Sequence, residues 1–214
     1  VSVYSMEFTD EIALTGELSE IGLPLRRNVD DSYRRGLEID LRWSVSDHWT
    51  ILHSSNLSHN RIDEWTQFYD VYDSQGNWID SDAITHSNVQ PLLTPEIVAN
   101  LGAEWSNSRV RIALVGRYVG DSRLDNTGSD EFIAPAYANL DLLASFGLGT
   151  WWSAAKPRLT VYANNLLDDL EQYPGGYSYQ FIVRDPAGSQ SFDGSPYYYP
   201  LAGRTVMAKL EFNF

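Results

Sequence analysis

Hydrophobic and polar residues alternate with a period of two near the end of the chain, over residues 204–214. Successive side chains of an extended strand point to opposite faces, so this alternation predicts a β-strand with one apolar and one polar face. The apolar face carries Val206, Ala208, Leu210, Phe212 and Phe214. The polar face carries Thr205, Met207, Lys209, Glu211 and Asn213.

The same alternation recurs upstream. It is clear in the segments 33–43, 97–105, 110–118, 137–148 and 158–164. It is weaker in residues 1–9 and in residues 49–61, where His53 and Ser55 fall on the face that should be apolar. The pattern therefore predicts an all-β protein with about eight strands in this chain.

The connections between these strands differ in length. Short polar links lie near residues 46–48, 106–109 and 149–157, and long ones cover residues 10–31, 62–94, 120–133 and 167–203. Outer-membrane barrels have short periplasmic turns at one end and long extracellular loops at the other. The long connections hold many Gly, Pro, Asn and Asp residues, which favour turns. We therefore expect one antiparallel transmembrane β-barrel unit over residues 1–214, with extracellular loops near 10–31, 62–94, 120–133 and 167–203.

Alternation alone does not separate a barrel from a β-sandwich, because both have one apolar face per strand. Aromatic residues near the strand ends favour the barrel, where they form girdles at the membrane interfaces. Trp43, Trp49, Trp105, Trp151 and Trp152 lie beside short links, and Tyr118 and Tyr137 lie beside long ones. No run of about 18 apolar residues is present, so the sequence predicts no transmembrane helix.

Composition excludes several functions. The formal net charge of −14 argues against nucleic acid as a partner, because binding phosphates requires an excess of Lys and Arg. Cysteine is absent, so no thiolate metal site can form. The four histidines are scattered, and no motif of nucleophilic, zinc-dependent or nucleotide-dependent catalysis occurs. We expect neither an enzyme nor a bound metal or cofactor.

Short motifs carry a resemblance to the C-terminal part of the barrel of TonB-dependent receptors. They follow the family order: Arg34–Ile39, Leu93–Pro95, Arg117–Gly120 with Leu124–Thr127, Ala134–Tyr137 with Leu140–Asp141, Asn164–Asp169, and Leu201–Thr205 with Phe214. Each motif alone is weak, whereas the ordered series is specific.

The resemblance implies about eight C-terminal strands of a barrel of about 22 strands, in the bacterial outer membrane. It further implies an N-terminal plug domain and the remaining barrel strands as partners, outer-membrane lipid around the wall, the TonB system acting through the plug, and the barrel-assembly machinery. No plug or TonB box is visible in residues 1–214, so we expect a fragment or one piece of a nicked receptor. The family's most frequent cargo is a ferric siderophore; oligosaccharide or another large nutrient is the alternative.

Two sets of residues are candidates for contacts inside and above such a barrel. Charged residues on the polar faces predict a lumen lining, and they include Arg42, Arg111, Arg117 and Asp141. Cross-strand pairing that hydrates the wall is their simpler role. Aromatic residues of the long loops suit stacking on sugar rings or planar chelators: Trp65, Tyr69, Tyr72, Trp78, Tyr177, Tyr179 and Tyr198. Packing of the loops on themselves explains these aromatics equally well.

The last strand has a role of its own by the resemblance. Its aromatic residues Phe212 and Phe214 are expected to act as the outer-membrane assembly signal. Two further hypotheses stay open at this stage. One is a free-standing eight-stranded outer-membrane barrel with an adhesive, structural or lipid-modifying role, because about eight strands can close. The other is a soluble all-β binding module, for example for carbohydrate.

Overall fold

The computed structural model describes residues 1–19, 21–149 and 155–213. Within these residues the chain forms strands and turns and no helix. The strands are β1 (Ser2–Leu18), β2 (Pro24–Ser44), β3 (Trp49–Asp73), β4 (Trp78–Val89), β5 (Ile97–Ser106), β6 (Val110–Val119), β7 (Ser122–Arg123), β8 (Ile133–Ala134), β9 (Tyr137–Gly147), β10 (Lys156–Asn164), β11 (Gly175–Arg184), β12 (Gln190–Tyr199) and β13 (Thr205–Asn213). In that part of the chain no helix has the length and apolar character needed to cross a membrane.

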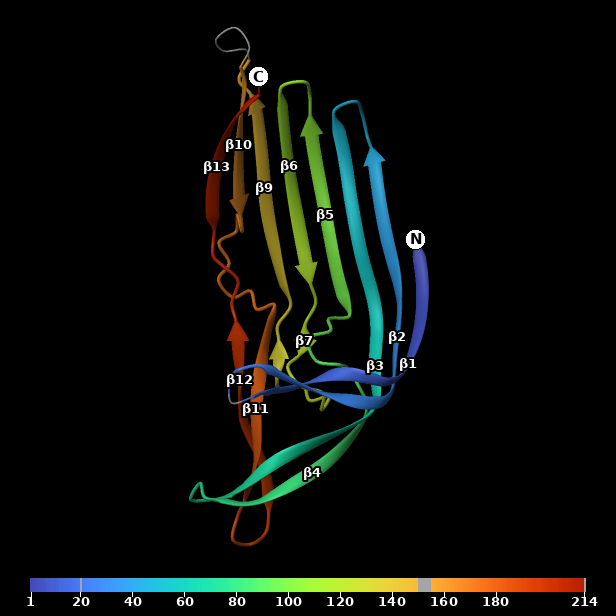
Figure 1. Cartoon of the computed structure of the whole chain (residues 1–214), viewed down its shortest axis with the longest axis vertical. Helices are drawn as coiled ribbons and strands as arrows, with labels where there is room; N and C mark the ends of the chain where they lie inside the picture. The colour runs from blue at the N-terminus through green and yellow to red at the C-terminus, as the bar shows by residue number, and fades with distance from the viewer. Residues whose placement is uncertain (20, 150–154, 214) are drawn as a thin grey trace.

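Eight strands form one antiparallel wall, in the order β1-β2-β3-β5-β6-β9-β10-β13. Figure 1 shows this wall as a single curved layer of long strands. Strands β1 and β13 stand at its two ends, and no pairing joins them among the described residues. The wall is therefore open, unlike the closed eight-stranded barrel considered above, and it is one layer, unlike a sandwich.

The strand register confirms that the wall has an apolar and a polar face. Directly opposed residues in an antiparallel sheet share a face. Leu41 opposes His53, which in turn opposes Leu101 of β5. On the other face Asp40 opposes Ser54, and Ser54 opposes Asn100. His53 and Ser55 do lie on the apolar face, where the His53 Nε2 and Ser55 Oγ atoms are 3.0 Å apart.

The buried clusters involve β2, β3, β4, β11 and the segments around β7 and β8, and not β5, β6, β9, β10 or β13. Many large apolar side chains of the wall are exposed, including Leu101 (60%) and Val206 (68%). The buried clusters lie instead where the long connections meet the wall and each other. They consist of Val29, Ile62, Trp65 and Val89; of Tyr69, Val71 and Ile182; and of Leu124, Phe132 and Ala134.

The long connections are built largely of β-hairpins. Strands β1 and β2 continue past the wall as a hairpin in which the Gly22 amide donates to the Ser19 carbonyl, β3 continues to pair with β4, and β11 pairs with β12. Figure 1 shows the β1/β2 hairpin running across the molecule, next to β11. The turns of the β3/β4 and β11/β12 hairpins have the same hydrogen-bond pattern. The backbone N–H of Asn77 donates to the Asp73 carboxylate, and the backbone N–H of Ser189 donates to the Asp185 carboxylate, both at 2.8 Å. Gly76 and Gly188 adopt positive φ there.

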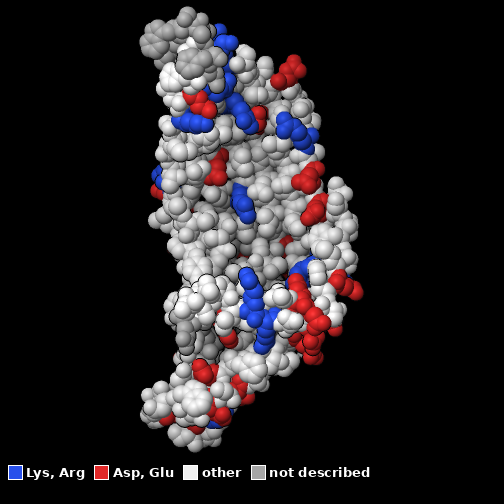
Figure 2. Space-filling view, in the orientation of Figure 1, with Lys and Arg blue, Asp and Glu red and all other residues white. Residues whose placement is uncertain are grey.

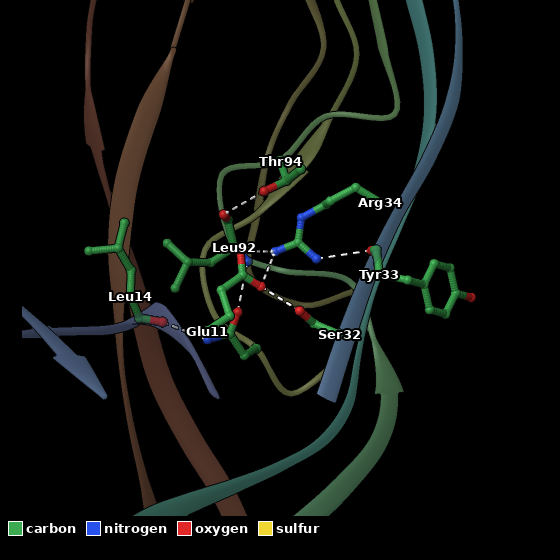
Figure 3. A network of polar contacts seen from close by, with 8 residues as sticks. Glu11, Leu14, Ser32, Tyr33, Arg34, Leu92 and Thr94 are labelled. Atoms are coloured by element: carbon green, nitrogen blue, oxygen red, sulfur yellow. Dashed lines mark hydrogen bonds and ion pairs between the residues drawn. The ribbon is translucent and has the colours of Figure 1, made fainter. Parts of the chain in front are cut away.

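Polar contacts link the two strands of the β1/β2 hairpin to each other, and further contacts join the hairpin to other segments (Figure 3). The Glu11 carboxylate accepts hydrogen bonds from Ser32 Oγ at 2.5 Å and from Arg34 Nη2 at 2.8 Å. Close by, Asn126 donates to the Leu14 carbonyl at 2.8 Å and accepts from the Leu92 amide at 2.7 Å. Because Asn126 is 1% exposed, these bonds fix three separate chain segments together.

Several motif residues singled out in the sequence meet at the ends of β9, β10 and β13. The buried Asn165 donates its backbone N–H to Asp141 (2.9 Å) and its side-chain amide to the Asp169 and Ala202 carbonyls. The Asp168 carboxylate accepts from the backbone and the guanidinium of Arg204, at 2.9 and 3.1 Å. The network fixes where β13 begins beside β10.

Candidate functional site

A cleft of about 480 Å³ lies among the hairpins. Its walls come from the β1/β2 hairpin, the β3/β4 hairpin, the β11/β12 hairpin and the segment that follows β7. The lining residues are Thr15, Gly16, Glu17, Gln67, Phe68, Tyr69, Asp70, Ser81, Asp125, Tyr177, Ser178, Tyr179 and Gln180. The volume falls within the range of about 300–1,000 Å³ that is usual for small-molecule sites.

Backbone pairing and a close glycine contact hold the walls together. Strand β11 pairs in parallel with the end of β3, where Ile182 lies opposite Val71. Gly16 has a φ of +87°, and a Cβ atom there would lie 3.2 Å from the Leu124 carbonyl oxygen. Any larger residue would therefore strain the backbone and push the β1/β2 hairpin away from the segment after β7.

Side-chain contacts between hairpins add to this support. The hydroxyl oxygens of Tyr72 and Tyr179 lie 3.3 Å apart, and Arg184 forms an ion pair with Asp80 at 3.4 Å. The rings of Tyr72 and Phe181 meet edge to face, with centroids 5.4 Å apart. The β3/β4 and β11/β12 hairpins therefore form a joined pair of walls.

The floor of the cleft contains a buried tyrosine and a buried carboxylate. Tyr69 is 3% exposed, and Asp125 is 4% exposed. Burial, with the nearby Asp125 carboxylate as a second cause, raises the pKa of Tyr69 to about 12. Asp125 accepts hydrogen bonds from the backbone and hydroxyl of Thr127 and from the Gln180 amide. Tyr69 is therefore a neutral phenol at physiological pH.

The structure brings together three of the aromatic residues predicted for the loops. Tyr69, Tyr177 and Tyr179 line the cleft. Tyr72 does not line the cleft, but its hydroxyl group contacts that of the lining residue Tyr179. Trp78 donates its indole N–H to the lining residue Asp70 at 3.1 Å, and its side chain is 59% exposed.

The other two predicted aromatics lie away from the cleft. Trp65 is buried in the hairpin core, with the Arg27 guanidinium 3.6 Å above its ring. Tyr198 donates to the Ile133 carbonyl at 3.1 Å. Both contacts tie loop segments to one another, in line with the alternative of loop self-packing.

The residues proposed for the lumen lie on the polar face of the wall. Arg42 opposes Leu52, and Arg117 opposes both Asn100 and Asn139. Arg111 forms an ion pair with Glu104 at 2.8 Å, and Asp141 binds the Asn165 backbone. In Figure 2 charges of both signs gather where the β1/β2 hairpin crosses the molecule, while the middle of the sheet shows few.

Of the two aromatic residues predicted as the assembly signal, the structure describes one. Phe212 lies on the apolar face of β13, opposite Pro157, and is 44% exposed. Phe214 lies outside the described residues, as do Trp151 and Trp152 of the expected girdle.

Sequence reasoning missed the polar lining of the cleft: Thr15, Glu17, Gln67, Ser81, Ser178 and Gln180. Their partners come from distant segments, so local spacing carries no signal for them. In the sequence, Asp125 appears only as part of the motif Leu124–Thr127, and Asp70 is one of several acidic residues in the long connection 62–94. No group of three or more His, Asp or Glu side chains in the described part of the chain could hold a metal ion.

Comparisons with known proteins agree with the fold. The wall is an antiparallel β-sheet of the kind that forms large outer-membrane barrels. The sequence profile described as "TonB dependent receptor-like, beta-barrel" matches residues 1–166. The chain therefore belongs to the family of TonB-dependent receptors, as a part of their β-barrel. A search of curated proteins finds no match.

Three solved structures illustrate the likeness of fold. The siderophore receptor PiuA of Acinetobacter baumannii has a TM-score of 0.60 and 16% identity, and the match covers 99% of this chain and 25% of that receptor. The ferric-catecholate import receptor Fiu of E. coli K12 has a TM-score of 0.55 and 14% identity, and the match covers 99% of this chain and 24% of that receptor. A mutant of the ferric enterobactin receptor PfeA of Pseudomonas aeruginosa has a TM-score of 0.52 and 14% identity, and the match covers 97% of this chain and 27% of that receptor. The chain thus spans about a quarter of these receptors.

Proposed function

We propose that this chain is part of an outer-membrane receptor that takes up a scarce nutrient in a TonB-dependent manner. The observation that carries the proposal is the match of residues 1–166 to the family's barrel profile. The wall supports it physically, since its exposed apolar face suits lipid and its polar face suits a wet or plugged lumen. The role is transport rather than catalysis.

In this proposal the polar-face residues Arg42, Arg111, Arg117 and Asp141 face the plug domain and the solute path. A charge that faced lipid near the membrane midplane would cost about 2–4 kcal/mol for an arginine, which favours the inward orientation. The hairpins that carry the cleft stand on the extracellular side. Phe212 and Phe214 serve recognition by the barrel-assembly machinery, and the TonB system acts on a plug supplied with the remaining strands.

A ferric siderophore or another metal chelate is the first candidate cargo. Its support comes from the names of the structural neighbours, which are receptors for a ferric catecholate, a siderophore and ferric enterobactin. An oligosaccharide or another large nutrient is the second candidate. The cleft favours the second, because its described lining contains aromatic rings, amides and carboxylates but neither Lys nor Arg.

Uptake in whole cells tests the proposed function. Cells that carry or lack the complete receptor gene are given radiolabelled ferric chelates and labelled oligosaccharides, each with and without a functional TonB system. The proposal expects one cargo to enter only when both the receptor and TonB are present. Uptake that is unchanged by loss of either one, for every cargo tried, would contradict it.

A further inference from the structure

We infer that the cleft binds a neutral carbohydrate and disfavours anionic chelates. This inference rests on the proposed function, because it names the class of cargo that the receptor recognises. Its first support is the set of hydrogen-bond donors and acceptors that the lining residues present. Glu17, Asp70 and Asp125 bring three carboxylates to the cleft, and an ionised carboxylate only accepts hydrogen bonds.

The two amide side chains of the lining are already engaged as donors. The Gln67 amide donates to Glu17 at 3.1 Å, and the Gln180 amide donates to Asp125 and to Ser178. Among the described residues, Glu17 accepts a side-chain hydrogen bond from Gln67 and Asp70 accepts one from Trp78, and an ionised carboxylate has about four acceptor sites. These two carboxylates therefore favour a ligand that supplies hydrogen-bond donors. Sugar hydroxyl groups do so, whereas an anionic chelate presents further acceptors and negative charge.

Two arginines of the hairpins that form the cleft are held elsewhere. The Arg27 guanidinium lies over the Trp65 ring and donates to the Thr66 carbonyl, and Arg184 is paired with Asp80. Burial lowers the pKa of Arg27, which opposes the attraction by Glu17. Neither side chain lines the cleft, and Arg27 offsets only part of the charge of one of its three carboxylates, Glu17.

Aromatic faces complete the site. Phe68 and Tyr179 are 61% and 47% exposed, and both border the cleft. Tyr177 stacks on Tyr197 with ring centroids 4.8 Å apart, which fixes the orientation of its ring. Rigid rings with polar edges suit the apolar C–H faces of sugars, while the carboxylates accept from the hydroxyl groups on the rim.

Binding to the purified complete receptor in detergent tests this inference. Three probes are compared: an array of uncharged oligosaccharides, an uncharged ferric trihydroxamate, and a trianionic ferric tris-catecholate. We expect at least one oligosaccharide to bind more tightly than either chelate. Tighter binding of the tris-catecholate or of the trihydroxamate than of every oligosaccharide would overturn the inference.

Paired substitutions locate the site. The double variant Glu17→Gln and Asp70→Asn should weaken oligosaccharide binding by about tenfold or more, because each charged acceptor is worth more than a neutral one. Glu64→Gln is the matched control, since Glu64 is an exposed carboxylate of β3 outside the cleft. Heat-modifiable gel mobility confirms that each variant is folded. Equal affinities of the double variant and the control would overturn the assignment.

Failure of the proposed carbohydrate site can be distinguished from failure of the proposed function. If an oligosaccharide binds in the cleft but its uptake does not depend on TonB, the proposed function fails while the binding site stands. If TonB-dependent uptake of a ferric chelate is found and no oligosaccharide binds, the carbohydrate assignment fails while the proposed function stands.

Discussion

The hydroxyl oxygen of Tyr72 lies 3.3 Å from that of Tyr179, and this contact joins two hairpins whose tyrosines are 107 positions apart. Together with burial and the nearby Asp70 carboxylate, it raises the pKa of Tyr179 to about 12. The contact stabilises the neutral phenol. Its stabilising effect is therefore present below the ordinary tyrosine pKa of about 10 and is lost as the pH rises towards 12.

Replacing Tyr72 by phenylalanine should lower the pKa of Tyr179 towards its ordinary value. Tyrosinate absorbance, followed during an alkaline titration, measures the change. Tyr199→Phe is the matched control, because Tyr199 lies on β12 and contacts Tyr177 through its ring. An identical titration of Tyr179 in both variants would show that the hydroxyl pair does not set this pKa.

Mild acid should loosen the β3/β4 hairpin through His86. Burial lowers the pKa of His86, whose Nε2 atom lies 3.5 Å from the Tyr69 hydroxyl. The folded hairpin thus binds a proton less readily than the unfolded chain. Its stability is fully present above pH about 6.5 and falls as the pH drops through the lowered pKa. Hydrogen exchange of β4 amides at neutral pH and at pH about 5 measures the effect.

Substitution separates His86 from other titrating groups. His86→Gln should remove most of the difference in exchange between the two pH values. His48→Gln should leave it unchanged, because His48 lies in the short link before β3 and contacts the Ser106 carbonyl. Persistence of the acid effect in His86→Gln would assign it to another group.

Two neighbouring arginines should differ in their importance for stability. Arg34 forms an ion pair with Glu11 in which the side chains are 18% and 24% exposed, whereas Arg35 pairs with Glu7 at 52% and 76%. Arg34→Gln should cost about 1.5–3 kcal/mol, because it leaves a partly buried carboxylate short of its charged donor. Arg35→Gln should cost no more than about 1 kcal/mol. The unfolding temperature in detergent compares them, and equal shifts would contradict the difference in burial.

A glycine of β2 should tolerate no side chain. A Cβ atom on Gly36 would lie 2.5 Å from the Tyr4 hydroxyl oxygen and 2.6 Å from the Leu57 carbonyl oxygen. Gly36→Ala should therefore destabilise the wall by about 1–3 kcal/mol. On β5, a Cβ atom on Gly102 meets its nearest neighbour at 3.4 Å, so Gly102→Ala is the matched control. Heat-modifiable mobility of the two variants tests the contrast, and similar melting would argue against it.

The contacts among the motif residues Asn165, Asp168 and Arg204 should control where β13 begins. Asp168 holds both the backbone and the guanidinium of Arg204, and Asn165 holds the neighbouring Ala202 carbonyl. Asp168→Ala should reduce the yield of assembled receptor in the outer membrane, because β13 then lacks its fixed starting point. Glu171→Gln, an exposed change nearby, should not. Equal yields would mean that β13 finds its place without this contact.

The sequence predicted the wall well and the hairpins poorly, for one physical reason. In the wall, one face of each strand is apolar and the other polar, so a period of two marks segments such as 110–118 and 137–148. Beyond the wall, both faces of β4 carry polar residues, for example Asp80 and Ser81, and the periodic signal disappears. The turns of these hairpins carry a local signal, since Asp73 and Asp185 each stand three residues before a glycine, although residues 62–94 and 167–203 were predicted as long loops. The cleft carries no such signal, because it requires segments that only the fold brings together.

The parallel pairing of β11 with β3 has a consequence for how the receptor is made. Residues near position 72 cannot acquire these partners until the chain beyond position 180 has been synthesised and exported. Contacts between distant segments form slowly, because the intervening chain must first be ordered. Seven of the eight described wall strands precede β11 in the chain, and only β13 follows it. A chain interrupted before β11 would therefore hold most of the wall and an incomplete cleft.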